Sequence, residues 1–359
     1  MTIYLLNSDA RHIPLADRSV QCVVTSPPYW GLRDYGTAQW LGGDEACDHK
    51  PGNVSRVGRT TLQGGKATSG HQQEGYKHTC EKCGAVRIDK QIGLERTPQE
   101  YVASIVAVMR EVWRVLRNDG VLWLNLGDTY SANRGYQVAQ TKDAGTKRAD
   151  DSFNNMSMKA NNIGVAPKNL IGIPWRVAFA LQDDGWYLRS DIIWSKPNPM
   201  PESVTDRPTK AHEYIFLLAK SERYYYDSEA IKEKSIYPND NRKAGSSTEQ
   251  KRMPTEMIAG VRPGSATYEN RNRRTVWTVA TKPYSGAHFA TFPPELVEPM
   301  ILAGSRPGDI VLDPFSGSGT VGRVSAKHGR RYVGLELNPA YIELALERTS
   351  KVQTALQFG

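Results

Sequence analysis

The sequence lacks long apolar runs and has little cysteine. No stretch approaches the roughly 18 consecutive apolar residues that a membrane-spanning helix needs. The first residues show no basic segment followed by a small-residue cleavage site, so we expect neither secretion nor membrane insertion. Four cysteines in 359 residues are too few for a disulfide scaffold. We therefore expect an intracellular protein with one large domain that carries insertions, or with two domains.

Basic side chains outnumber acidic ones. Lysine and arginine together number 46, and aspartate and glutamate 38, which gives a formal net charge of +8. An excess of this kind favours a polyanionic partner, with nucleic acid as the first candidate. The apolar fraction of 39% is low and indicates a core diluted by long polar loops.

Strand-like and helix-like segments alternate along the chain. The best helix signal is a capping box that starts at Thr97, with Pro98 at the first helical position, and we expect this helix to end at Asn118-Asp119-Gly120. Further helices are expected at residues 174–185 and 321–328 and from residue 339. Several β-rich runs are apolar on both faces, as in a buried parallel sheet. Strands are predicted at residues 3–6, 22–25, 121–126, 192–194, 214–218, 310–312 and 332–335, and the alternation predicts an α/β fold.

A glycine-rich turn follows the strand that ends near Asp313. Residues 313–320 read Asp-Pro-Phe-Ser-Gly-Ser-Gly-Thr and run into a helix, so backbone N–H groups can approach a ligand closely. About 20 residues later Glu336 ends the next strand, where a carboxylate can accept hydrogen bonds from ribose hydroxyls. No Lys-Ser or Lys-Thr follows the glycines, and Gly322 breaks the G-x-G-x-x-G spacing, which disfavours ATP hydrolysis and NAD binding. The pattern predicts a nucleoside-cofactor site.

A second motif follows the second predicted strand. Residues 25–30 read Thr-Ser-Pro-Pro-Tyr-Trp, and the two prolines fix φ and hold a turn open. In an open α/β sheet ligands bind at this carboxyl edge of the strands. The alternative is a simple Pro-Pro turn without a chemical role, which the neighbouring serine and aromatic side chains disfavour.

The two motifs together resemble those of the β-class S-adenosylmethionine-dependent DNA amino-methyltransferases, which methylate N4 of cytosine or N6 of adenine. Their order fits as well, because in this class the catalytic tetrapeptide precedes the cofactor loop. Further matches are residues 123–128, 193–198 and 288–296. The resemblance implies a Rossmann-like seven-stranded methyltransferase sheet, circularly permuted, with polar insertions. It also implies a cytoplasmic enzyme of bacterial or phage origin.

The resemblance assigns site residues and a mechanism. The implied catalytic residues are Ser26, Pro27, Pro28 and Tyr29, and the implied cofactor-binding residues are Asp9, Asp313, Pro314, Phe315, Gly317, Gly319, Thr320, Glu336, Asn338, His288, Thr291 and Phe292. The Ser26 hydroxyl and the Pro27 carbonyl would accept the two amine hydrogens while Tyr29 stacks on a base flipped out of the duplex. The methyl group would then pass in line from S-adenosylmethionine, and Asp9 would bind its adenine.

The first tetrapeptide position bears on the target base. Serine there is more typical of cytosine-N4 enzymes, so N4 of cytosine is preferred and N6 of adenine is the alternative. No Pro-Cys pair occurs anywhere, which argues against a carbon-5 cytosine methyltransferase.

Polar insertions divide the implied methyltransferase domain. We expect residues 1–41 and 94–235 to form its catalytic part, 42–93 a Cys/His insertion, 131–168 a mobile loop, 236–280 a basic target-recognition region and 281–359 the cofactor-binding part. Residues expected to contact DNA are Arg242, Lys243, Arg252, Arg271, Arg273 and Arg274. The expected partner is double-stranded DNA, while a cognate restriction endonuclease and a homodimer stay open.

Three of the cysteines fall in the Cys/His insertion. Cys47 and His49 precede a Cys80-x-x-Cys83-Gly pair, which together supply four ligands of the types that zinc prefers. We expect a structural zinc, with His78 as an alternative to His49. A redox pair is disfavoured because no thioredoxin-like unit surrounds it.

Two other classes of function stay open. A non-catalytic zinc-containing nucleic-acid-binding protein would use the Cys/His insertion and the basic region without binding S-adenosylmethionine. An RNA or protein-glutamine methyltransferase would share the cofactor, but the permuted order and the large insertion disfavour it.

Overall fold

The computed structural model describes residues 2–31, 37–49, 79–89, 91–131, 165–235, 269–282 and 293–357. Several predicted features lie outside these ranges. They are most of the stretch 131–168, the alternative ligand His78, the basic residues Arg242, Lys243 and Arg252, and the cofactor residues His288, Thr291 and Phe292.

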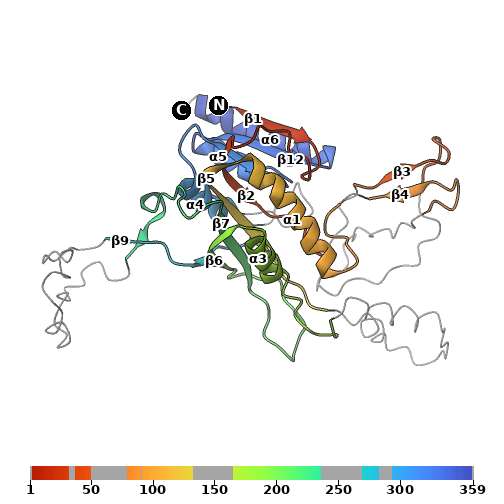
Figure 1. Ribbon diagram of the computed structural model, residues 1–359, viewed down its shortest axis with the longest axis horizontal. Coiled ribbons are helices and arrows are strands. Elements are labelled where there is room, and N and C mark those ends of the chain that lie inside the picture. The colour runs from red at the N-terminus through yellow and green to blue at the C-terminus, as the bar shows by residue number, and fades with distance from the viewer. Residues whose placement is uncertain are drawn as a thin grey trace, which may run out of the picture.

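In the described part of the chain, eight strands form one sheet in the order β1-β12-β11-β2-β5-β7-β6-β10 (Figure 1). They are β1 (Ile3–Asn7), β2 (Val20–Thr25), β5 (Leu116–Leu126), β6 (Tyr187–Ser195), β7 (His212–Ala219), β10 (Val276–Thr278), β11 (Ile310–Asp313) and β12 (Arg331–Glu336). All seven predicted strands are present, which confirms the α/β class. The eighth strand, β10, escaped prediction because it has three residues and only Trp277 is buried.

Strand direction departs from an all-parallel sheet at β7. The strands β1, β12, β11, β2 and β5 run parallel to one another, whereas β7 is antiparallel to both β5 and β6. The expectation of a parallel sheet is therefore wrong for β7. Ile215 and Phe216 of this strand belong to the cores on opposite faces, so its sequence is apolar on both sides whatever its direction.

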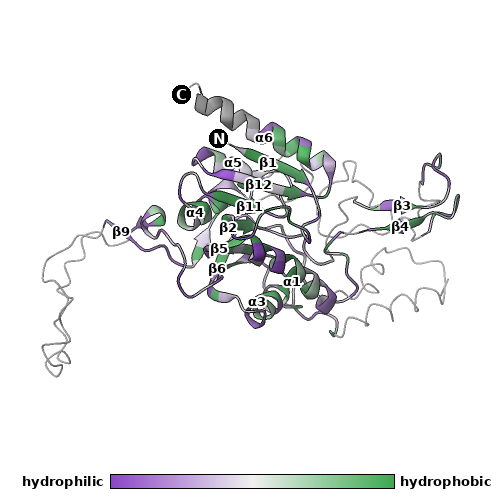
Figure 2. Cartoon of the chain, turned by 45° about the horizontal axis from the view of Figure 1, so that its top comes forward, coloured by the Kyte–Doolittle hydropathy of each residue, from purple (hydrophilic) through white to green (hydrophobic). Residues whose placement is uncertain are grey.

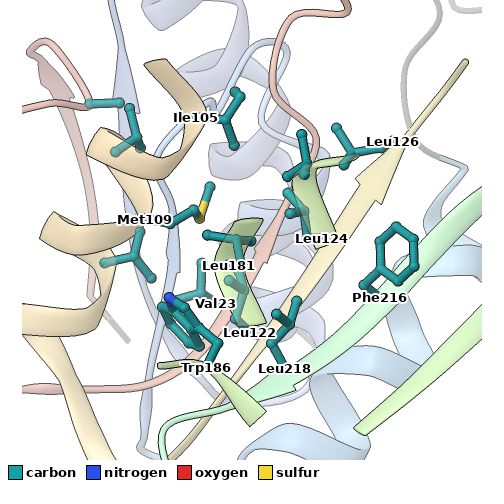
Figure 3. Packing of buried hydrophobic residues seen from close by; sticks show 14 of the residues in the cluster. Val23, Ile105, Met109, Leu122, Leu124, Leu126, Leu181, Trp186, Phe216 and Leu218 are labelled. Carbon is teal, nitrogen blue, oxygen red and sulfur yellow. The ribbon is translucent and has the colours of Figure 1, made fainter. Parts of the chain in front are cut away.

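Helices cover both faces of the sheet (Figures 1 and 2). α1 (Pro98–Val115) and α3 (Ile173–Asp183) pack on one face, and α4 (Pro294–Gly304) and α5 (Thr320–Lys327) on the other. Alternate residues of β2 serve the two cores, with Val23 on the α1 side and Cys22 and Val24 on the α4 side. Figure 3 shows the first core, where Ile105 and Met109 of α1 point toward the strands.

The start of α1 is confirmed and its predicted end is wrong. The Thr97 hydroxyl accepts a hydrogen bond from the Glu100 N–H over 3.2 Å, as the capping box predicts. The helix ends at Val115, and β5 begins at once, so residues 118–120 lie in a strand. Gly120 permits this because a Cβ there would lie 3.0 Å from the Gln21 carbonyl oxygen of β2.

The chain ends confirm the circular permutation. β1 pairs in parallel with β12, so that Asn7 lies opposite Glu336. α6 (Pro339–Gln357) follows β12 and lies against β1 and α5, and both termini lie at the same edge of the protein (Figure 1). We name residues 313–320 the cofactor turn and residues 26–29 the catalytic turn, after the roles expected of them. A chain that continued from α6 into β1 would place the cofactor turn before the catalytic turn.

Two small antiparallel pairs stand outside the main sheet. β3 (Gln39–Leu41) pairs with β4 (Val86–Ile88) well away from the sheet (Figure 1). β8 (Glu233–Lys234) pairs with β9 (Asn270–Arg271), next to the 3-10 turn η2 (Glu229–Ile231). Among the described residues, the helices are too short or too polar to cross a membrane.

Candidate active site and metal-ligand cluster

The two sequence motifs meet at the carboxyl ends of β2 and β11. The Thr25 hydroxyl donates to Asp313 Oδ1 over 2.7 Å, and both side chains are buried. Burial raises the pKa of Asp313 to about 7, although the hydrogen bonds from Thr25 and from the Phe315 N–H act in the opposite direction. One buried hydrogen bond therefore joins the catalytic turn to the cofactor turn.

The glycine-rich turn closes onto the acid at the end of β12. The Gly317 N–H donates to Glu336 Oε2 over 2.9 Å, and the Asn338 N–H donates to Oε1 over 2.8 Å. Burial raises the pKa of Glu336. Gly319 has φ of +74°, and a Cβ there would lie 2.8 Å from the Cβ of Ala345, so only glycine fits. The strand, turn and helix predicted around Asp313 are present.

The turn after β1 approaches the same acid through Asn7. The Asn7 side-chain amide donates to the carbonyl oxygens of Glu336 and Leu337, each over 3.0 Å. Asp9 accepts hydrogen bonds from the Arg11 guanidinium on both carboxylate oxygens, the shortest over 2.6 Å. Sequence reasoning selected Asp9 here and missed Asn7, whose role depends on the β1–β12 pairing.

The catalytic turn contains a partly buried hydrogen-bond network. Asn125 Oδ1, at the end of β5, lies 3.3 Å from Ser26 Oγ and 2.9 Å from the Tyr29 hydroxyl oxygen. The Tyr29 hydroxyl also lies 2.6 Å from Glu213 Oε2 of β7, and Lys196 pairs with the other Glu213 oxygen. Burial and the negative Glu213 raise the pKa of Tyr29, so its hydroxyl stays protonated.

The orientation of Asn125 is fixed from the far side. Its Nδ2 donates to the Tyr214 carbonyl oxygen over 3.0 Å, which leaves Oδ1 to face Ser26. Asn125 and Lys196 lie within segments that matched the family by sequence, but no role could be given to them. Glu213 carried no sequence signal, because its contacts come from the antiparallel pairing of β7.

Close packing holds the rest of the turn. A Cβ on Gly127 would collide with the Tyr29 ring, so the ring lies directly on the backbone that follows β5. The Tyr101 hydroxyl of α1 donates to the Pro28 carbonyl oxygen over 2.9 Å. The Trp30 indole N–H donates to the Glu95 carbonyl oxygen over 2.9 Å. The turn is thus anchored by β5, β7 and α1 together.

Three of the expected DNA-contacting arginines are described. Arg271 and Arg274 both donate to Glu233 Oε1, over 2.8 Å and 2.6 Å. Arg273 is half-buried, with its guanidinium 4.7 Å from the centre of the Trp277 ring. These contacts fasten the β8–β9 pair and the start of β10, and Arg274 is the most exposed of the three arginines.

The predicted metal ligands come together. The ligand atoms of Cys47, His49, Cys80 and Cys83 all lie within 4.8 Å of one another. Cys47 Sγ lies 3.9 Å from Cys80 Sγ, close to the ~3.8 Å between two thiolates on a tetrahedral zinc with bonds of about 2.3 Å. Backbone hydrogen bonds from Ala85 and Asp44 lower the pKa of the Cys83 thiol.

Backbone contacts shape this cluster. The Cys80 N–H donates to the Ala85 carbonyl oxygen over 2.7 Å, and the Gly84 N–H donates to the Cys80 carbonyl oxygen over 2.8 Å. A Cβ on Gly43 would lie 2.7 Å from Cys83 Sγ, so the two chain segments touch there. The donor set of three thiols and one imidazole fits Zn²⁺.

The Rossmann-like sheet carries a glycine-rich turn at residues 313–320 and a Ser-Pro-Pro-Tyr turn at residues 26–29 on the same edge. This arrangement is typical of enzymes that bind a nucleoside cofactor. A family model described as DNA methylase matches residues 20–347. The chain belongs to this family of N6 and N4 amino-methyltransferases, as the sequence resemblance predicted.

Curated relatives support the same family. Type II methyltransferase M.Cfr9I of Citrobacter freundii is 45% identical over 336 residues, covering 93% of this chain and 82% of that protein. Type II methyltransferase M.SmaI of Serratia marcescens is 42% identical over 327 residues, covering 91% of this chain and 83% of that protein.

Solved structures share the fold. The PvuII DNA methyltransferase, titled cytosine-N4-specific, superposes with a TM-score of 0.53 at 16% identity, covering 99% of this chain and 91% of that chain. The Thermus thermophilus protein TTHA0409, solved in complex with S-adenosyl-L-methionine, gives a TM-score of 0.51 at 22% identity, covering 98% of this chain and 94% of that chain. These likenesses confirm the methyltransferase fold.

Proposed function

We propose that this protein transfers a methyl group from S-adenosylmethionine to N4 of a cytosine that is flipped out of double-stranded DNA. The observation that carries this proposal is the environment of Ser26, whose hydroxyl oxygen lies beside the acceptor oxygen of Asn125. Transfer to N6 of adenine is the alternative, since the same turn can serve both amines.

The reaction needs hydrogen-bond acceptors at the target amine. The lone pair of an exocyclic amine is delocalised into the ring, and acceptors for its two hydrogens draw the nitrogen toward tetrahedral geometry. A serine hydroxyl can donate or accept. Asn125 Oδ1 can only accept, so it draws the Ser26 hydroxyl hydrogen inward and leaves the oxygen lone pairs for the substrate. The Pro27 carbonyl would accept the second hydrogen.

Tyr29 would stack on the flipped base. Its hydroxyl is held by Glu213 and Asn125, and its ring lies against Gly127. A ring that is oriented before the base arrives reduces the entropy lost on stacking. Extrusion of the base costs a few kcal/mol, which contacts to the DNA strands would offset.

S-adenosylmethionine would bind along the carboxyl ends of β11 and β12. Glu336 uses one lone pair of each oxygen on backbone N–H groups and keeps acceptor capacity for ribose hydroxyls. The remaining proposed contacts come from Asp313, Pro314, Phe315, Gly317, Gly319, Thr320 and Asn338. The Asp9 carboxylate already accepts hydrogen bonds from Arg11, so a contact from Asp9 to the adenine would be made next to the Arg11 guanidinium. When bound, the cofactor supplies the electrophilic methyl group.

The division of labour along the chain follows from these placements. We propose residues 1–41 and 94–235 as the catalytic part, 281–359 as the cofactor-binding part and 236–280 as the basic target-recognition region. Two relatives above 40% identity are named Type II methyltransferases, which supports a restriction-modification setting with a cognate endonuclease.

We also propose that Cys47, His49, Cys80 and Cys83 hold one structural Zn²⁺. Four protein ligands of these types close the coordination sphere, which is typical of structural sites and leaves no position for a substrate.

The test is product analysis. Purified protein is incubated with unmethylated DNA and S-adenosylmethionine, and the DNA is then digested to nucleosides and separated by mass and retention. N4-methylcytosine is expected, and Ser26→Ala should abolish its formation. If N6-methyladenine forms instead, the mechanism stands and the assignment of cytosine as target base is wrong. If neither methylated nucleoside forms although the protein binds the cofactor, DNA is not the substrate.

A further inference from the structure

The metal-ligand cluster belongs to a small lobe that is inserted into the chain directly after the catalytic turn. We define the Cys/His lobe as residues 37–49 and 79–89, which include β3 and β4. The chain leaves the catalytic turn at Gly31 and returns to it at Gly93, and the Gly31 N–H donates to the Gly93 carbonyl oxygen over 2.8 Å. The two glycines therefore close a neck between the lobe and the catalytic turn.

The neck touches the main chain of the tetrapeptide. Gly31 and Gly93 have φ of +70° and +102°, a conformation that other residues rarely adopt. A Cβ on Gly93 would lie 3.0 Å from the Tyr29 carbonyl oxygen and 3.4 Å from the Cβ of Pro28. The neck backbone therefore lies close to the backbone that carries the Tyr29 ring, and a side chain at position 93 would crowd it.

A continuous set of contacts connects the neck to the metal ligands. At the base of the lobe the Thr37 hydroxyl donates to Asp89 Oδ1 over 2.9 Å, and the Gln91 N–H donates to the same oxygen over 3.0 Å. Above them β3 pairs with β4, and the chain beyond these strands carries the ligands. Asp89 thus connects the neck to the β3–β4 pair through these hydrogen bonds.

The lobe has almost no apolar core. Among its described residues only Cys80 and Ala85 are buried apolar side chains, while Leu41, Val86 and Ile88 are exposed. So few buried apolar side chains among the described residues contribute little to holding β3 against β4, and the stacking of Trp40 on His49 adds one further contact. The cysteines are free, so a metal bound by the four ligands would add a strong link between the two chain segments.

Ion pairs add further contacts within the lobe. Among its described residues, Lys82 pairs with Asp48 over 2.7 Å and Arg87 pairs with Asp89 over 3.3 Å. The second pair links β4 to the residue that contacts the neck.

Resting on the proposed methyl transfer, we infer that the Cys/His lobe is a metal-dependent brace for the catalytic turn. A Zn²⁺ bound by Cys47, His49, Cys80 and Cys83 would hold β3 and β4 together. The hydrogen bonds of Asp89 to Thr37 and Gln91 would then fix the position of the Gly31–Gly93 neck, which lies behind Tyr29. Loss of the metal would leave the cofactor turn intact and misplace the base-binding side of the site.

The first measurement is metal content, which needs no activity. We expect one zinc per chain, and after exchange for Co²⁺ the absorption of a tetrahedral thiolate site, both lost in Cys83→Ser. Cofactor binding to Cys83→Ser, measured by calorimetry, should stay within about twofold, whereas single-turnover methyl transfer should fall about ten- to hundredfold, as for displacements near 1 Å.

Asp89→Ala separates metal binding from the brace. It should keep one zinc per chain and normal cofactor binding, yet lose methyl transfer to a similar extent. Glu45→Gln, on an exposed side chain of the same lobe, is the matched control and should keep both properties.

Each outcome decides between defined alternatives. Wild-type transfer rates in Cys83→Ser or in Asp89→Ala would overturn the brace. An active wild-type protein without metal would overturn the metal site and leave the proposed function standing. A protein that binds zinc and cofactor but methylates no DNA would overturn the proposed function, and the metal content would still stand.

Discussion

The Tyr29 hydroxyl lies 2.6 Å from Glu213 Oε2, so the catalytic turn after β2 is fastened to an antiparallel strand two positions away in the sheet. Lys196 pairs with the other oxygen of the same carboxylate. Glu213→Gln removes the charge that balances this half-buried ammonium and weakens the acceptor for Tyr29. We expect kcat for methyl transfer to fall about tenfold to a hundredfold with little change in cofactor affinity.

Two controls test this prediction, an exposed glutamate and a variant that lacks the Tyr29 hydroxyl. Glu222→Gln, on an exposed side chain, should have no effect. In a Tyr29→Phe background the Glu213→Gln change should cost much less, because the contact is already lost. Equal losses in the two backgrounds would show that Glu213 acts on stability or on another group.

Asn125 is predicted to set the direction of the Ser26 hydroxyl. Asn125→Ala removes one of the two internal acceptors of the Ser26 hydroxyl and leaves only the longer contact with the Tyr29 hydroxyl, so the hydroxyl hydrogen can point at the substrate amine more often. We expect kcat to fall about tenfold, the equivalent of one hydrogen bond worth ~1.4 kcal/mol. Ser26→Asp supplies a carboxylate that only accepts, and in this background Asn125→Ala should cost less, because only its contact with the Tyr29 hydroxyl is lost. A tenfold loss in both backgrounds would contradict the assignment.

The sequence predicted local elements better than the contacts between distant strands. Seven strands and the turns around Ser26 and Gly317 are present, because each is encoded by residues close together in the chain. The four grouped metal ligands come from two such local pairs, at residues 47 and 49 and at residues 80 and 83. Asn125, Glu213 and Asn7 were missed, because their roles arise from strand pairing between distant segments. The direction of β7 was missed for a related reason, since burial on both faces conceals it.

Asp313 gives a prediction about pH. Its pKa is raised from its ordinary value to about 7 by burial, so between about pH 4 and 7 the folded protein holds a proton that the unfolded chain releases. The folded state therefore binds more protons, and stability should fall as pH rises through this window. Burial of Glu336 acts in the same direction.

The measurement is Tm from pH 5 to 8 in wild type and in Asp313→Asn. The amide keeps an acceptor for Thr25 and Phe315 and cannot titrate, so the variant should show a smaller decline of Tm with pH. Thr25→Val removes a hydrogen bond that lowers the pKa of Asp313 and should extend the decline to higher pH. A steeper decline in Asp313→Asn would contradict the assignment.

Neighbouring arginines of the basic region should behave differently. Arg274 is largely exposed and shares Glu233 with Arg271, so it can turn to a phosphate when DNA binds. Arg274→Gln should weaken binding to any duplex and reduce the slope of log K against log salt by about 0.9, the value for one phosphate contact. Arg273 is half-buried over Trp277, and Arg273→Gln should lower stability by about 1 kcal/mol and leave the slope unchanged. Binding titrations at several salt concentrations, with thermal unfolding of both variants, distinguish the two roles, and the reverse pattern would assign the DNA contact to Arg273.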